Sequence, residues 1–111
     1  MSSPAQVLET RHPWHESTDE ALSAQVRELN GRGLRVTALS LRSEYLPRTG
    51  IRVLAEPAED PQQTVEHRYD IKSDADLAAV VLAYNATGSR IATFAIRYWG
   101  QPCVTFILER A

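Results

Sequence analysis

The hydrophobic pattern of the chain predicts a helix in its first half. Leu22, Val26 and Leu29 recur at the spacing of one apolar helix face. Ser17 or Thr18 precedes this stripe and is a suitable N-cap, because a hydroxyl oxygen accepts a hydrogen bond from a free N–H of the first turn. We therefore expect a helix from this point whose apolar stripe packs against a sheet.

A second helix with the same plan is predicted in the other half of the chain. Ser73 is its N-cap, and Asp74 and Asp76 lie in the first turn, where negative charge favours the helix dipole. Its apolar stripe has four members: Leu77, Val80, Val81 and Tyr84. Both helices should end at a glycine, Gly33 and Gly88, since glycine adopts the left-handed conformation of a helix C-terminus without a steric penalty.

The segments after the two glycines predict strands. RVTALSLR and RIATFAIRYW are rich in β-branched and aromatic residues and alternate in character. The side chains expected on the helix-covered face are Leu39, Leu41, Phe94 and Ile96. A further strand follows each segment, IRVLAE in the first half and VTFILE in the second, and the acidic, proline-rich AEPAEDPQQ separates the halves.

These parallels amount to an internal repeat. NGRGLR at 30–35 returns as NATGSR at 85–90, and residues 22–42 match 77–97 at seven of 21 ungapped positions. VLETRH near the start also resembles TVEHRY at 64–69. The sequence thus predicts one α+β domain over 1–111, made of two tandem βαββ units at about 5–57 and 62–111. The strands should form a mainly antiparallel, six-stranded sheet with two helices on one face.

The repeated glycines predict architecture and no phosphate site. A phosphate-binding loop places its glycines before a helix N-terminus, where free N–H groups point at the anion. Gly33 and Gly88 follow predicted helix C-termini, which have the opposite polarity.

Composition narrows the class of protein. A formal net charge of -2 argues against a surface that is basic throughout, as nucleic-acid and lipid-binding proteins often have. Cys103 is the single cysteine, so the chain has no internal disulfide framework. The first sixteen residues have no apolar core of a signal peptide, and no stretch approaches the length of a membrane span. We therefore expect a cytoplasmic protein that does not enter membranes.

Few residues suggest catalysis or metal binding. His12, His15 and His67 could ligate a metal with nearby carboxylates, but HPWH is interrupted by proline and is more typical of surface histidines. Cys103 lies in a predicted strand and is interpreted as a small buried hydrophobe. We expect no cofactor, no metal and no catalytic residue. The alternative is a small hydrolase or isomerase that uses His67, Glu66 or Cys103 in a cleft between the repeats.

The sheet face away from the helices is the candidate binding surface. Alternation places thirteen residues there: Val36, Ala38, Ser40, Arg42, Arg52, Leu54, Ile91, Thr93, Ala95, Arg97, Trp99, Thr105 and Ile107. Together these residues are too apolar for a solvent-exposed surface, and arginine and tryptophan are enriched in interface hot spots. The predicted binding residues are Arg42, Arg52, Arg97, Tyr98 and Trp99.

The sequence also carries a resemblance to known domains. LNGRGLRV at 29–36 follows a helix, and VTFILER is a closing strand that ends in an acid and an arginine. This pattern resembles bacterial tandem-repeat domains that flank some secreted hydrolases, and small strand-helix-strand-strand domains of unknown function. The resemblance implies an α+β module with a binding or accessory role and supplies no catalytic residues. The chain differs from the secreted version, since we find neither a signal peptide nor an enzymatic domain.

We therefore expect a non-enzymatic binding, adaptor or inhibitor module that acts through its open sheet face or an edge strand. The expected occupant is another protein, a second copy of the chain, or both. One alternative is nucleic acid stacked on Trp99 and Tyr98, with Arg42, Arg52, Arg68 and Arg97 contacting phosphates.

Overall fold

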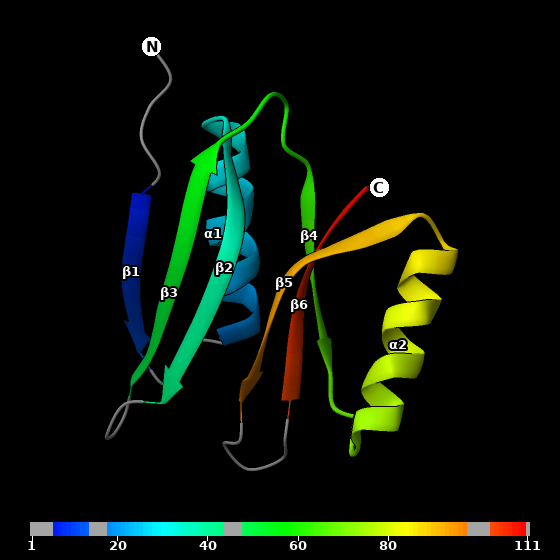
Figure 1. Cartoon of the computed structure of the whole chain (residues 1–111). Helices are drawn as coiled ribbons and strands as arrows, with labels where there is room; N and C mark the ends of the chain where they lie inside the picture. Colours follow the sequence, from blue (N-terminus) through cyan, green and yellow to red (C-terminus); the bar gives the residue numbers. More distant parts are fainter. Residues whose placement is uncertain (1–5, 14–17, 44–47, 98–102, 111) are drawn as a thin grey trace.

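The computed structural model describes residues 6–13, 18–43, 48–97 and 103–110. The first half contains β1 (Gln6–Pro13), α1 (Thr18–Gly31), β2 (Leu34–Ser43) and β3 (Arg48–Pro57). The second half contains β4 (Gln63–Arg68), α2 (Asp74–Ala86), β5 (Ser89–Arg97) and β6 (Cys103–Arg110) (Figure 1). This order confirms the predicted α+β class and its two similar strand-helix-strand-strand units.

The strands form two antiparallel sheets of three strands each. Their orders are β1-β3-β2, which we call the first sheet, and β4-β6-β5, the second sheet. We expected a single six-stranded sheet, and the structure instead places β2 and β5 beside each other at the junction of two separate sheets (Figure 1). The three strands of each sheet all come from one unit, and both units place their last strand in the centre of the sheet.

The two sheets also match in register. Val36 pairs with Ala55 and Ile91 with Leu108, and a bulge follows Val36 and Ile91 at the same point in each unit. The ladders therefore define which residues are counterparts. Because Val7 and Ala38 both pair with Leu54, while Val65 and Thr93 both pair with Ile107, these three positions correspond one to one.

The start of α2 and the ends of both helices follow from local chemistry as predicted, while Ser17, an N-cap candidate of α1, lies outside the described residues. The Ser73 hydroxyl accepts a hydrogen bond of 3.1 Å from the backbone N–H of Asp76 and so caps α2. Gly33 and Gly88 have φ angles of 77° and 82°, in the left-handed region that favours glycine. The repeated N-x-x-G-x-R is therefore a helix end followed by a strand start in both units.

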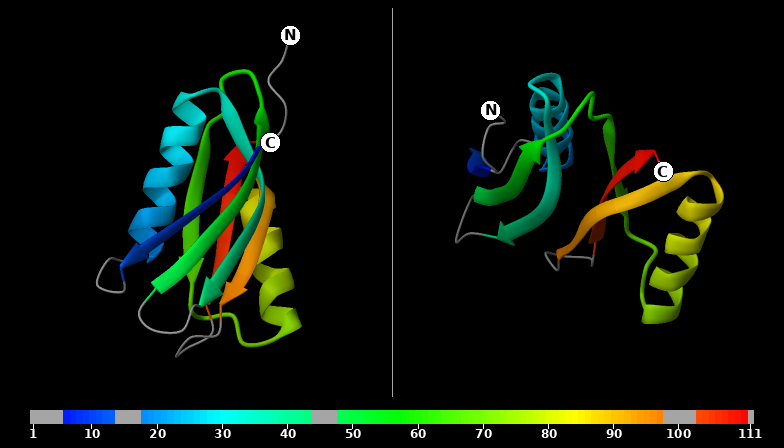
Figure 2. Two further views of the ribbon diagram at one scale, coloured as in Figure 1. Left: turned by 90° about the vertical axis from the view of Figure 1, so that its left-hand side faces the viewer. Right: turned by 45° about the horizontal axis from the view of Figure 1, so that its top comes forward.

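The two helices lie on opposite faces of the second sheet. Successive residues of a strand point to opposite faces. Accordingly, Ile107 joins the α1 core with Leu22 and Val26, whereas Phe106 joins the α2 core with Tyr84. Figure 2 shows α1 and α2 on the two sides of the strands. We expected both helices on one face of the sheet. In the structure, α1 also covers the face of the second sheet that is opposite to α2.

The bulges change which residues face the core. Val36 is fully buried against α1, although simple alternation assigned it to the open face, because Thr37 is the extra residue that reverses the alternation. Thr105 and Ile107 were assigned to the same open face and are also fully buried. Phe94 and Ile96 lie on the α2 side of the second sheet as expected, but they remain 45% and 41% exposed.

Candidate functional site

The face of the first sheet that points away from α1, which we call the outer face, is partly apolar and open. Val7 and Leu54 are 67% and 36% exposed, and they are direct neighbours in the β1–β3 ladder. Ala38 and Ser40 on β2 are exposed beside them. Together with Arg52, these residues form a small apolar centre with a polar border, the composition typical of a protein interface.

The counterpart face of the second sheet is buried. Ile107, the counterpart of Leu54, has no exposed surface and packs in the α1 core. Val65, the counterpart of Val7, packs against the same core. Among the described residues, the same positions thus receive a helix in one unit and none in the other, so the outer face repeats the positions that a helix covers on the second sheet.

The predicted binding residues are only partly brought together. Arg52 is exposed on β3, between Glu9 on β1 and Ser40 on β2. Arg42 lies opposite Gly50 at the end of β2, and Arg97 lies opposite Cys103 at the end of β5. Figure 1 shows that β2 and β5 end at the same end of the molecule. Tyr98 and Trp99 lie outside the described residues.

A buried carboxylate joins the two units. Glu109 on β6 accepts hydrogen bonds from both predicted repeat arginines: 2.7 Å from Nε of Arg35 and 3.1 Å from Nε of Arg90. Nε2 of Gln63 donates a further bond of 3.1 Å to the same carboxylate. These donors lower the pKa of Glu109 to about 2, against the opposing effect of burial.

Gln63 extends this network into the first sheet. Its side-chain amide donates to the Val36 carbonyl and accepts from the Val36 N–H, both at 2.8 Å. The backbone N–H of Gln63 donates to the Asn30 side chain at 2.8 Å. Sequence reasoning missed this junction, although the matching arginines and the acid at the end of each closing strand were the signal for it.

The junction borders an open cleft of about 920 Å³ between the units. Its lining includes Arg27, Arg35, Arg90, Glu59, Glu109 and Arg110. Arg35 and Glu109 form a bidentate pair there, in which two N–H groups of the guanidinium donate to the two carboxylate oxygens. The cleft therefore holds a structural ion cluster at its base.

The residues of the enzymatic alternative do not line this cleft. Nδ1 of His67 lies 2.9 Å from the Thr105 hydroxyl, and the Cys103 sulfur lies 3.9 Å from that hydroxyl. Cys103 and Thr105 are buried, and Glu66 belongs to the opposite face because it pairs with Phe106. The contacts hold Cys103 within the packed interior of the second sheet.

The histidines and Arg68 belong to two other expectations from the sequence, a metal site and a nucleic-acid surface. Within the described ranges, no group of three or more His, Cys, Asp or Glu side chains is placed to hold a metal ion. His15 lies outside the described residues, and His12 lies at the end of β1 opposite Thr49. Arg68, proposed for a nucleic-acid surface, lies on β4 of the second sheet, and its Nη2 is 2.7 Å from Oδ2 of Asp70. Arg52 lies on β3 of the first sheet.

Comparisons with known proteins found no relative of this chain. No family model, curated protein or solved structure matches the chain. In the described part of the chain, neither helix has the length and apolar character to cross a membrane.

Proposed function

We propose that this protein is a small non-enzymatic binding module, an adaptor or inhibitor, that holds another protein on the outer face of its first sheet. The observation that carries the proposal is the pair of counterparts Leu54 and Ile107. Ile107 is fully buried under a helix, while Leu54 presents the same kind of position to solvent. An aliphatic residue at an exposed sheet centre favours association, since burying it on binding removes apolar surface from water.

The neighbouring edge strengthens the proposal. β1 is the outermost strand of the first sheet, and Val7 on β1 continues the apolar centre formed by Leu54. A partner seated on the outer face can therefore also reach the free edge of β1, where a peptide strand adds to a sheet through backbone hydrogen bonds. Its place of action is the cytoplasm, where the buried free thiol of Cys103 stays reduced.

The test is affinity purification of the tagged protein from its own host with nuclease treatment, followed by mass spectrometry. Three forms are compared: the natural chain, Leu54→Asp on the outer face, and Ala24→Asp on the exposed side of α1 as the matched control. We expect a stoichiometric protein with the natural chain and the control, and its loss with Leu54→Asp.

Two results would refute the proposal. Equal recovery of the partner with Leu54→Asp would exclude the outer face as the binding surface. Material that disappears only on nuclease treatment would favour the nucleic-acid alternative, and its affinity should then fall steeply with salt.

A further inference from the structure

Helix α2 has an apolar outer surface. In α2, which the structure describes throughout, only Val80 and Tyr84 are buried. Leu82 is 68% exposed, and residues 77–89 contain no charged side chain. The exposed apolar side chains of this surface are Ala75, Ala78, Ala79, Leu82, Ala83 and Ala86. Apart from Asp74 and Asp76 in the first turn and Asn85 near the end, the exposed side chains of α2 are therefore apolar, and an apolar helix surface is typically covered.

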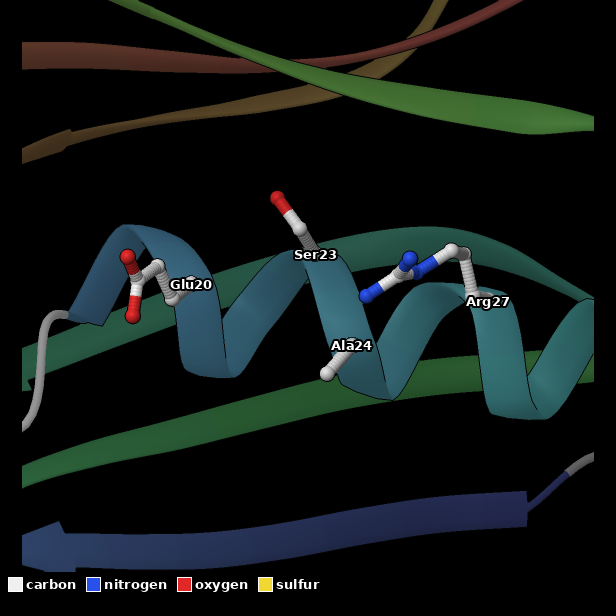
Figure 3. Close-up of a pocket in the computed structure, with 4 residues that line it drawn as sticks. All are labelled: Glu20, Ser23, Ala24 and Arg27. Carbon is white, nitrogen blue, oxygen red and sulfur yellow. The ribbon is translucent and has the colours of Figure 1, made fainter.

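The counterpart surface of α1 is polar. At the offset of 55 that relates the two units, Ala75, Ala78, Ala79 and Leu82 correspond to Glu20, Ser23, Ala24 and Arg27. Figure 3 shows these four residues on α1, where they line a shallow hollow. Glu28 takes the place of Ala83. Two helices in equivalent positions thus carry different surfaces, and that of α1 is the more polar.

The first sheet has a face on which no described helix packs. This is the outer face, whereas its counterpart on the second sheet is covered by α1 through Ile107 and Val65. Among the described residues, one chain therefore presents an apolar helix surface without a sheet on it and a partly apolar sheet face without a helix on it. Within one molecule, α1 already packs on the face of the second sheet that corresponds to the outer face. A helix of another copy can pack on the outer face in the same way.

Both open surfaces lie on the same side of the molecule. Figure 2 shows α1 on one side of the strands and α2 on the other, so the outer face, which points away from α1, looks toward the side of α2. Along the strand layer the two are at opposite ends, with β1 at one end and α2 at the other in Figure 1. A two-fold axis between two copies brings each α2 over the other copy's outer face.

We propose that the partner on the outer face is a second copy of this chain, bound reciprocally. α2 of each copy packs on the outer face of the other, with Leu82 against Leu54 and Val7. This inference rests on the proposed binding role of the outer face and names its occupant. The single chain is flat, with extents of 43 × 38 × 18 Å and a radius of gyration of 14.2 Å. A compact domain of this length has a radius of gyration of about 13 Å.

The experiment uses the full chain and two complementary variants, Leu54→Arg and Leu82→Glu. Both side chains are exposed enough that circular dichroism should show an unchanged fold. Sedimentation velocity over a range of concentrations should give a dimer for the natural chain and for Ala24→Glu, and a monomer for each of the two variants. An equimolar mixture of the variants should form a dimer again, because one contact is then natural and the other pairs opposite charges.

Each other outcome contradicts the reciprocal dimer. A natural chain that stays monomeric overturns it. A dimer unaffected by Leu82→Glu indicates sheet-to-sheet contact, a dimer unaffected by Leu54→Arg indicates helix-to-helix contact, and a mixture that stays monomeric excludes the helix-on-sheet pairing. If the natural chain is monomeric while Leu54→Asp still abolishes capture of a different protein, the dimer fails and the proposed function stands.

Discussion

At the scale of single residues, Glu109 is a carboxylate held by donors from three side chains. It is only 8% exposed, and Arg35 and Arg90 reach it from different units. Its counterpart Glu56 is 49% exposed and lies 3.4 Å from Arg35. The two acids occupy the same position in similar units, yet only one is enclosed by donors. Their comparison isolates the energetic effect of the junction.

We predict that Glu109→Gln lowers the free energy of unfolding by about 2–3 kcal/mol, since it removes the enclosed carboxylate charge that both Arg35 and Arg90 contact. Glu56→Gln, the matched control, should lower it by less than about 1 kcal/mol, because exposed ion pairs contribute little. Urea denaturation monitored by circular dichroism measures both. Equal losses for the two variants would show that the enclosed network adds no stability.

Acid should weaken the same junction. The pKa of Glu109 is about 2 in the folded protein against 4.5 for an unperturbed glutamate, so its contribution is complete above about pH 4.5. As the pH falls from 4.5 toward 2, the unfolded chain takes up a proton first and that stability is lost.

The natural chain should therefore approach Glu109→Gln in stability as the pH falls. Denaturation curves at pH 7, 4 and 2.5 would measure the gap between the two proteins. A gap that stays constant over this range would contradict the low pKa of Glu109.

At the scale of elements, the two helix ends show how far local sequence specifies structure. Gly33 and Gly88 were predicted to end the helices, and both have positive φ angles there. The bulges after Val36 and Ile91 were not predicted, because neither glycine nor proline marks them. The alternating sequence pattern does not show where a single extra residue is inserted, because a bulge is defined by the register with the neighbouring strand.

Substitution of these glycines by alanine should be costly. We predict that Gly33→Ala and Gly88→Ala each lower the free energy of unfolding by about 1 kcal/mol, because a Cβ disfavours the left-handed conformation. Gly31→Ala is the control, since Gly31 closes α1 without a positive φ and a Cβ there meets nothing within 4 Å. It should be neutral or slightly stabilising in thermal denaturation. A loss at Gly31 equal to that at Gly33 would argue against the conformational explanation.

At the scale of the whole molecule, Ile107 links the two units. It belongs to the second sheet by pairing and to the α1 core by packing. Its counterpart Leu54 lies on the outer face. The asymmetry between these two residues is the basis of both functional proposals, and it exists only in the assembled molecule.

We predict that Ile107→Ala lowers the free energy of unfolding by about 2–4 kcal/mol, as expected for a fully buried aliphatic side chain. Leu54→Ala should lower the stability of the monomer by less than about 1 kcal/mol, because its side chain is already in contact with water. Chemical denaturation at low protein concentration, where any dimer has dissociated, measures both. Similar losses would mean that the outer face is packed in solution.

The sequence by itself determined the α+β class, the two similar units, the helix ends and the order of elements. These properties follow from spacing, capping and glycine conformation, which act within a few residues of the chain. Only the tertiary structure decided that the strands form two sheets, that Val36, Thr105 and Ile107 are buried, and that Glu109 collects both arginines. The physical reason is that equivalent positions in a repeat receive different neighbours once α1 packs across both sheets, and no local pattern records which copy is covered.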